Sequence, residues 1–251
     1  MTTTKEINMS KFGLIGKNID YSFSKSYFTE KFKAENLDHA YENFDISNIS
    51  EFHNIIAQNL DLKGLNVTIP YKEEVIPFLD EMDNTAQNIG AVNTVKVLPN
   101  IQLKGFNTDY WGFQKALEEF LPLERKTALI LGTGGASKSI AYALRAMNFE
   151  IKFVSRKANK KVLSYSQLNQ EVIEHHLLIV NCTPLGTFPN IKDHPSIPYE
   201  YIGSNHLLFD LIYNPSETEF LRRGKLKGAK TSNGLTMLKF QAEKAWEIWN
   251  S

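Results

Sequence analysis

The chain has 251 residues, of which 42% are hydrophobic, and its 28 Lys and Arg balance 28 Asp and Glu to a formal net charge of zero. This length allows one large or two small domains with a sizeable core, and the balanced charge excludes a global field that attracts nucleic acid. The first residues lack an apolar leader, and no run reaches the roughly 18 apolar residues that span a bilayer. We therefore expect a cytoplasmic protein with neither membrane nor nucleic-acid partners. Cys182 is the single cysteine and no histidine has metal-ligand spacing, so we expect neither a disulfide nor a metal site.

The first hundred residues alternate β-branched or aromatic runs with helix-periodic segments. We expect strands at 12–16, 41–46 and 65–68, and helices at 24–36 and 49–60. This βαβα alternation predicts a largely parallel sheet. Two further runs, 91–98 and 101–106, flank Pro99-Asn100 and predict a hairpin.

The second part of the chain restarts the same alternation. A helix is expected over 110–120, and a second helix-periodic segment covers 234–249. The connection 156–177 is too weakly periodic for a crossover helix, so a shortened or irregular link is expected there. The strands of this part are expected to begin at 127 and to include 151–155, 177–182, 207–211 and 229–231.

A glycine turn is the strongest single motif. The apolar run 129–131 breaks into Gly132-Thr133-Gly134-Gly135-Ala136, which aims backbone N–H groups and a helix N-terminus at a pyrophosphate. About twenty residues later, Ser155 and Arg156 stand where an NAD-binding fold places an acidic residue, and an arginine there favours the 2′-phosphate of NADP. The plainer interpretations are a turn that only packs a helix against a strand, and a solvated arginine at a strand end.

Three more polar groups lie at strand ends. Lys72 follows the run 66–70, Asn93 lies near the start of the expected strand 91–98, and Asp109 follows the expected strand 101–106. Because ligands bind at the carboxyl ends of strands in α/β sheets, these side chains are candidates for one pocket, with Lys72 and Asp109 as a proton-transfer pair. The alternatives are an exposed lysine and a helix N-cap.

Ser22 and Ser24 directly follow the first expected strand. Their hydroxyls, together with helix N-terminal amides, can hold a substrate carboxylate. Helix capping explains one of the two serines without any function.

These motifs, in this order, resemble the shikimate dehydrogenase family over nearly the whole chain. The family reduces 3-dehydroshikimate to shikimate with NADPH, on the route to chorismate and the aromatic amino acids. The motifs that carry the resemblance are residues 22–24, 66–72, 90–94, 107–109, 132–137, 181–186, 210–215 and 234–241.

The resemblance implies an α/β fold of two domains. Residues 1–108 with 235–251 would form a substrate domain with a mostly parallel sheet, and the C-terminal helix would pack back onto this domain. Residues 109–234 would form a Rossmann-like, doubly wound NADP domain. It also implies a small-molecule substrate and a monomer or homodimer.

The resemblance assigns roles residue by residue. Lys72 and Asp109 would be the catalytic pair. Tyr213 would lie near the substrate and the nicotinamide, and Arg156 would clamp the 2′-phosphate. The other substrate ligands would be Ser22, Ser24, Thr68, Asn93 and Gln241, and the other cofactor residues Gly132, Gly134, Gly135, Ala136, Ser155, Thr183, Gly234 and Met237.

Two departures concern the cofactor. The family's Asn-Arg-Thr is Ser155-Arg156-Lys157 in this chain, and the connection that follows is shorter than usual. The alternatives are a quinate/shikimate dehydrogenase that also uses NAD, and a cofactor-binding paralogue without turnover. The presence of both Lys72 and Asp109 argues against the second.

Overall fold

The computed structural model describes residues 9–20 and 22–251, so the expectation about the first six residues lies outside the described part. The chain divides into two compact units. The first unit runs to Thr108 and includes Ala242–Ser251, and the second is Asp109–Gln241. In the described residues, no helix is both long and apolar enough to cross a membrane.

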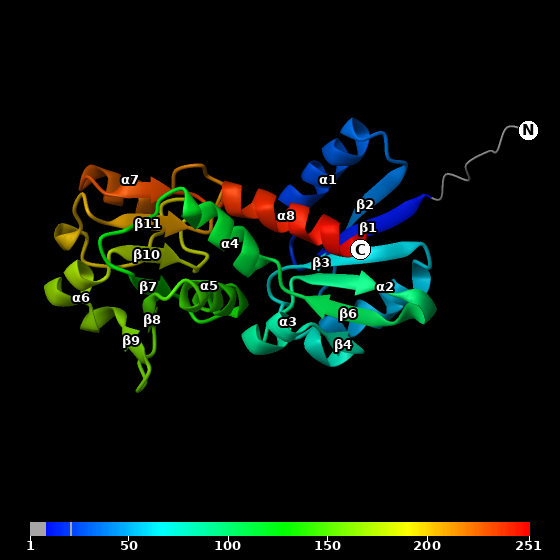
Figure 1. The fold of residues 1–251 in the computed structure, drawn as a ribbon, viewed down its shortest axis with the longest axis horizontal. Coiled ribbons are helices and arrows are strands. Elements are labelled where there is room, and N and C mark those ends of the chain that lie inside the picture. The colour runs from blue at the N-terminus through cyan, green and yellow to red at the C-terminus, as the bar shows by residue number, and fades with distance from the viewer. Residues whose placement is uncertain (1–8, 21) are drawn as a thin grey trace, which may run out of the picture. The chain divides into compact units, whose positions relative to one another are not determined.

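The first unit is built on a mixed six-stranded sheet in the order β2-β1-β3-β5-β6-β4 (Figure 1). β1 pairs in parallel with β2 and β3, whereas β5 is antiparallel to both β3 and β6. Its strands are β1 Ser10–Gly16, β2 His39–Asp45, β3 Leu62–Val67, β4 Glu81–Met82, β5 Thr94–Val97 and β6 Leu103–Phe106. Its helices are α1 Phe23–Ala34, α2 Phe52–Gln58 and α3 Asn84–Ile89, with 3-10 turns η1 Ile49–Glu51, η2 Ile76–Phe78 and η3 Pro99–Ile101.

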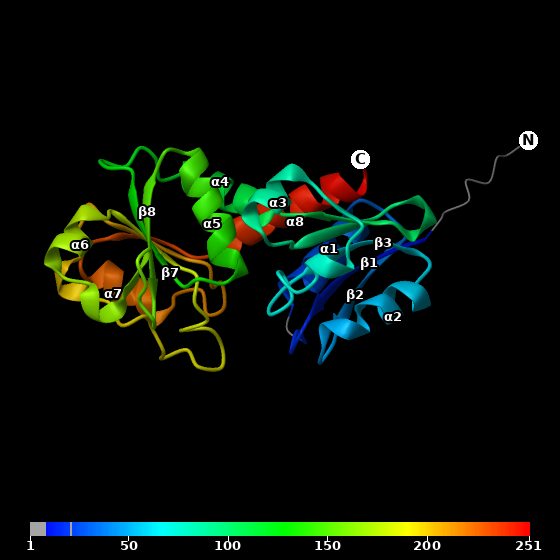
Figure 2. The same ribbon diagram turned by 90° about the horizontal axis from the view of Figure 1, so that it is seen from below.

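Alternating side chains give this sheet a core on each face. Phe12 and Leu14 of β1 pack with α1 and with Ala242–Trp249 of α8 (Leu235–Trp249). Ile15 points to the other face and packs with α2, which Figure 2 shows beside β1, β2 and β3. The period of two along each strand thus places one hydrophobic set on each side.

The second unit holds a wholly parallel six-stranded sheet in the order β12-β11-β10-β7-β8-β9. The order reverses between β7 and β10, which is the topological switch point of a doubly wound dinucleotide fold. Its strands are β7 Thr127–Leu131, β8 Glu150–Ser155, β9 Val162–Ser164, β10 Leu178–Asn181, β11 Leu207–Asp210 and β12 Lys230–Ser232. Its other elements are α4 Asp109–Glu118, α5 Gly135–Ala146, η4 Tyr165–Gln167, α6 Gln170–His175, η5 Tyr199–Tyr201, α7 Glu219–Leu226 and the first part of α8.

Both faces of this sheet are covered, as a parallel sheet requires. Ala128 and Ile130 of β7 pack with α4 and α5, and Leu129 and Leu131 pack with α6 and α7. Figure 2 shows the sheet lying between these two pairs of helices.

The expected α/β class, the hairpin over β5 and β6 and the terminal helix are confirmed. The sequence analysis missed α3 and α7, although Asp83 and Thr218 cap them through hydrogen bonds to Ala86 N and Leu221 N. The connection after β8 has no long crossover helix. It contains β9, a 3-10 turn and the six-residue α6.

Trp249 anchors the end of α8 within the first unit. Its ring stacks on Phe12 at 5.0 Å, and its Nε1 donates to Val95 O at 3.0 Å. Gly64 of β3 makes this packing possible, since a Cβ there would lie 2.2 Å from Trp249 Nε1. The glycine is therefore required by close approach rather than by its backbone dihedrals.

We predict that Gly64→Ala lowers the free energy of unfolding by about 1–3 kcal/mol, because the added methyl displaces the Trp249 ring. Urea denaturation followed by tryptophan fluorescence measures the change. Gly203→Ala is the matched control, because a Cβ at Gly203 meets nothing within 4 Å. Equal stability of the two variants would contradict the packing argument.

Candidate active site

One edge of the first sheet collects several of the sequence-predicted residues. β5 is antiparallel to β3 and β6, so its start lies beside their ends. Thr68 follows β3, and its N–H donates to Ile15 O of β1 at 2.9 Å. Asn93 precedes β5, and its N–H donates to Phe106 O of β6 at 3.1 Å. The sheet thus gathers residues from four strands at one edge.

Lys72 lies in the turns that follow β3. Thr68 O accepts from Tyr71 N at 2.9 Å, and Lys72 O accepts from Val92 N at 2.7 Å. The second bond fixes the Lys72 backbone beside the segment that carries Asn93. Lys72 and Asn93 therefore belong to the same edge of the sheet, although twenty residues separate them in the chain.

Asn93 is buried and clamps the segment that leads to Asp109. Its Oδ1 accepts from Thr108 N at 2.6 Å, and its Nδ2 donates to Thr108 Oγ1 at 3.0 Å. Asn107 Nδ2 donates to Ala91 O at 2.9 Å. Asp109 follows Thr108 directly, begins α4 and is 4% exposed. It is the first residue of the second unit, whereas Lys72 belongs to the first.

The two serines have different environments. Ser22 is the N-cap of α1, and its Oγ accepts from Lys25 N at 3.2 Å. Ser24 is buried and hydrogen-bonds to the hydroxyl of Tyr41, which donates to Asn66 Oδ1 at 2.7 Å. Burial raises the pKa of Tyr41, so this hydroxyl stays protonated and keeps its donor role.

Asn66 continues a chain of buried polar groups across the sheet. Its Nδ2 lies 3.4 Å from Thr94 Oγ1, and Thr94 Oγ1 donates to Asn93 Oδ1 at 3.2 Å. The hydrogen bonds thus run from Ser24 to Asn93. The sequence analysis did not single out Tyr41 or Thr94 as site residues.

The glycine turn of the second unit has the geometry of a phosphate-binding turn. Gly132 has φ of 109°, and a Cβ there would lie 3.3 Å from Cys182 O. Gly134 is the N-cap of the twelve-residue α5, followed by Gly135 and Ala136. Because Gly134 has no side chain, no capping group competes for the N–H groups of the first turn.

A cavity of about 800 Å³ opens beside this turn. Thr133 lines it from the turn, Ser155 from the end of β8, and Arg156 and Lys157 from the following loop. Asn159 and Val162 complete its lining. The lining contains two cationic side chains and no carboxylate. This composition suits a phosphate on the ribose better than a free 2′-hydroxyl.

A second buried network lies at the ends of β10 and β11. Asp210 is fully buried, and its carboxylate accepts from Asn181 Nδ2 at 3.0 Å, Ile212 N at 3.0 Å and Thr218 Oγ1 at 2.6 Å. Asn181 Oδ1 in turn accepts from Thr183 Oγ1 at 2.7 Å and from Thr183 N at 3.0 Å. Burial raises the pKa of Asp210 to about 6, although its three hydrogen bonds act in the opposite direction.

The remaining sequence-predicted residues of the second unit lie around this network and on α8. Tyr213 follows Ile212, whose carbonyl accepts from Gly234 N at 3.0 Å. A Cβ at Gly234 would lie 2.1 Å from Leu211 O. Met237 is 5% exposed and packs in the core, and Gln241 Nε2 donates to Leu238 O at 3.0 Å. The structure therefore brings Thr183 and Tyr213 to adjacent strand ends.

Cys182 lacks the environment of a reactive thiol. It is partly buried and packs against the core of the second unit. Burial raises the pKa of its thiol, and the nearby Asp210 and Asp109 raise it further. A protonated thiol is a weak nucleophile.

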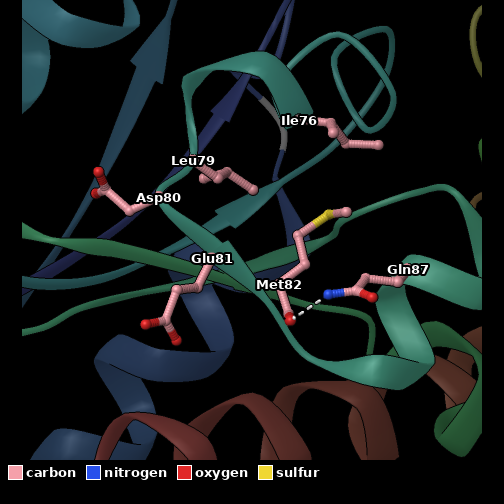
Figure 3. Close-up of a pocket in the computed structure, with 6 residues that line it drawn as sticks. All are labelled: Ile76, Leu79, Asp80, Glu81, Met82 and Gln87. Atoms are coloured by element: carbon pink, nitrogen blue, oxygen red, sulfur yellow. Dashed lines mark hydrogen bonds between the residues drawn. The ribbon is translucent and has the colours of Figure 1, made fainter.

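Another hollow, of about 500 Å³, lies in the first unit around β4 and is shown in Figure 3. Gln87 Nε2 donates to Met82 O across it at 3.0 Å. None of the sequence-predicted site residues lines it, and two carboxylates do, which disfavours an anionic substrate. Its lining residues are Ile76, Leu79, Asp80, Glu81, Met82 and Gln87.

Comparison with known proteins matches residues 14–95 to the shikimate dehydrogenase substrate binding domain. A shikimate dehydrogenase (NADP(+)) of Methanococcus vannielii is 36% identical over 94% of this chain and 90% of its own. The crystal structure of Thermus thermophilus shikimate 5-dehydrogenase with NADP(H) and shikimate has a TM-score of 0.86 at 32% identity, over 96% of this chain and 93% of its own. A quinate dehydrogenase from Corynebacterium glutamicum in complex with NAD has a TM-score of 0.85 at 27% identity, over 96% of this chain and 93% of its own.

We predict that Asp210→Asn removes a pH dependence of stability. Because the pKa of Asp210 is raised in the folded protein, the unfolded chain ionises first as the pH rises from 4 to 6. The wild type therefore loses stability relative to the variant over this range, by about 1.4 kcal/mol for each unit of pKa shift. Thermal unfolding at pH 4.5 and 7.5 measures the difference.

Asp193→Asn is the control, since Asp193 is an exposed carboxylate of the same unit. Its stability should follow the wild type at both pH values. Parallel pH profiles for wild type and Asp210→Asn would contradict the raised pKa.

Proposed function

The chain belongs to the shikimate dehydrogenase family, and from that premise we propose that it catalyses the reversible, NADP-dependent reduction of 3-dehydroshikimate to shikimate. It would be an oxidoreductase acting on a CH–OH group in the synthesis of chorismate and the aromatic amino acids. The observation that carries the proposal is the shared edge of the first sheet. There Lys72 O accepts from Val92 N, and Asn93 binds Thr108, the residue before Asp109.

We assign the two sequence-predicted domains to the two ligands. Residues 1–108 with 235–251 would bind the substrate, and residues 109–234 the nucleotide. Gly132, Gly134, Gly135 and Ala136 would present N–H groups to the pyrophosphate, and Ser155 and Arg156 would face the 2′-phosphate ribose. Thr183, Gly234 and Met237 would line the nicotinamide end. When bound, NADPH supplies the hydride.

Lys72 would hold the proton that the product alcohol requires. Its ammonium Nζ would donate to the oxygen of the ring carbonyl as negative charge develops there. Asp109 would accept a hydrogen bond from a ring hydroxyl and orient the ammonium. The first turn of α4 gives Asp109 a favourable electrostatic position as an anion.

The substrate carboxylate would be held by Ser22 and Ser24. Ser22 Oγ accepts from Lys25 N, which leaves its own hydroxyl proton to donate to a carboxylate. Thr68, Asn93 and Gln241 would bind the ring hydroxyls, and Tyr213 would lie between substrate and nicotinamide.

Two alternatives have specific consequences. A quinate/shikimate dehydrogenase that uses NAD would oxidise quinate with NAD, the cofactor named for the similar Corynebacterium structure. Arg156 and Lys157, without a carboxylate in their cavity, favour NADP instead. A non-catalytic cofactor-binding paralogue would bind nucleotide without turnover, and has no need of both Lys72 and Asp109.

We propose that the protein acts in the cytoplasm as a monomer or homodimer and has no nucleic-acid partner. Light scattering of the purified chain establishes which of the two assembly states it adopts.

We predict that shikimate with NADP gives the highest turnover among shikimate or quinate paired with NADP or NAD. Steady-state absorbance of the reduced nicotinamide measures all four combinations side by side. Faster oxidation of quinate with NAD would favour the quinate alternative, and nucleotide binding without oxidation of either acid would favour the non-catalytic one.

We predict that Lys72→Ala lowers kcat by about 10²- to 10⁴-fold, the usual contribution of general acid catalysis. The KM for shikimate should change only several-fold, because other side chains would hold the substrate. Lys63→Ala is the control, since Lys63 is an exposed lysine on β3, and it should keep the wild-type kcat. An unchanged kcat for Lys72→Ala would reject its assignment.

A further inference from the structure

The loop between β1 and α1 leads into the two candidate carboxylate-binding serines. β1 ends at Gly16, and α1 begins at Phe23 with Ser22 as its N-cap. Within this loop Asn18 has a positive φ of 56°, a left-handed conformation that is unfavourable for a residue with a Cβ. Such a conformation persists where the surrounding structure holds it in place. The contacts of this loop therefore decide its shape.

The carboxylate of Asp45 holds this loop from the neighbouring strand. Asp45 is the last residue of β2, which pairs with β1 in the sheet. Its Oδ1 accepts from Asn18 N at 3.0 Å, and its Oδ2 accepts from Ile19 N at 3.1 Å. Hydrogen bonds to an ionised acceptor are roughly twice as strong as neutral ones. One side chain thus binds two successive backbone N–H groups and fixes the turn directly after β1.

Further contacts hold Ile19 and its neighbours. Asn43, two residues earlier on β2, donates from Nδ2 to Ile19 O at 3.0 Å. The Ile19 side chain is buried and belongs to the same core as Phe28 of α1. On the other side of the loop, Lys17 N donates to Ile69 O at 3.2 Å. The loop is therefore bonded to β2 and to the turns after β3, and it packs against the core beneath α1.

The two serines differ in how much they depend on this loop. Ser24 is buried and hydrogen-bonds to the hydroxyl of Tyr41 on β2, so the strand holds it directly. Among the described residues, the Ser22 hydroxyl hydrogen-bonds only to Lys25 N, within the first turn of α1. The position of Ser22 relative to the sheet therefore depends on the packing of α1 and on the loop that precedes it.

We propose that Asp45 is a positioning residue for substrate binding, which holds the loop so that the Ser22 hydroxyl meets the substrate carboxylate. The inference rests on the proposed function, in which Ser22 binds that carboxylate. Asp45 itself touches neither substrate nor cofactor in this assignment, and acts through the backbone of Asn18 and Ile19. Because hydrogen bonds weaken steeply as their length and angle depart from the optimum, a displaced Ser22 binds the carboxylate less tightly.

Asp45→Ala should raise the KM for shikimate about fivefold to thirtyfold, as the loss of one hydrogen bond to a charged group implies. The kcat should stay within about threefold, because the loop carries neither Lys72 nor Asp109. The KM for NADP should stay within about twofold, because the proposed nucleotide site belongs to the second unit. Asp45→Asn keeps one carbonyl oxygen as an acceptor and should restore part of the loss.

Asp38→Ala is the matched control. Asp38 is an exposed aspartate that precedes the other end of β2, and its carboxylate forms no hydrogen bond with the loop in the part of the chain that the structure describes. This variant should keep the wild-type KM for shikimate. Amide hydrogen exchange of Asn18 and Ile19, measured without substrate, should become several-fold faster in Asp45→Ala and stay unchanged in Asp38→Ala.

A double-mutant cycle separates positioning from general destabilisation. If Asp45 acts through Ser22, Asp45→Ala should change the KM for shikimate by less than about twofold in a Ser22→Ala background. In a Ser24→Ala background, Asp45→Ala should cause about the same loss as in the wild type, since the loop does not hold Ser24. A general structural defect would give equal losses in both backgrounds.

Four results would overturn the positioning role in an active wild type, and each would leave the proposed reaction intact. They are an unchanged KM for shikimate in Asp45→Ala, unchanged amide exchange in that variant, equal losses in the two serine backgrounds, or the same loss in Asp38→Ala. Wild type that neither binds nor oxidises shikimate would instead reject the proposed function, and this role with it.

Discussion

The hydrogen bonds between Asn93 and Thr108 are the constraint on which the first unit's site geometry depends. Asn93 Oδ1 accepts from Thr108 N at 2.6 Å, and both residues are buried. A buried amide that lost these partners would leave donors and acceptors unsatisfied, at a cost of about 1–3 kcal/mol each. The pairing therefore holds the end of the β5–β6 hairpin closed. Asp109, the first residue of the second unit, follows Thr108 directly in the chain.

Other buried polar groups of the first sheet are also paired by hydrogen bonds. Ser24, Tyr41, Asn66 and Thr94 are all buried, and each has a hydrogen-bonding partner within the chain. Fully satisfied networks of this kind specify one arrangement, because any shift in register breaks several bonds at once. In the second unit Asp210 has the same function, since it joins the turn after β10 to the turn after β11 through Asn181 and Ile212. Each network therefore links the strand ends around it through several hydrogen bonds.

Local signals made much of this architecture predictable. The alternation of apolar runs located most strands, and the glycine turn located the start of α5. Ser22 is a helix cap, as one of its two interpretations required. The part that could not be predicted depends on contacts between residues that are far apart in the sequence. Tyr41 and Asn66 are 25 residues apart, and Asn181 and Asp210 are 29 apart, so no local pattern indicates that they meet. The short α6 and β9 were not predicted either, because such short elements have too few residues to show a period.

The two interpretations of Arg156 can now be weighed by physical argument. A solvated arginine at a strand end needs no cavity beside it. A carboxylate near such an arginine reduces the positive electrostatic potential around its guanidinium. The structure instead places Arg156 and Lys157 against a cavity of about 800 Å³ whose lining has no acidic residue. Two like charges on adjacent residues repel each other, and a bound anion beside them would offset that repulsion. The composition of the lining therefore supports the proposed contact between Arg156 and the 2′-phosphate of NADP.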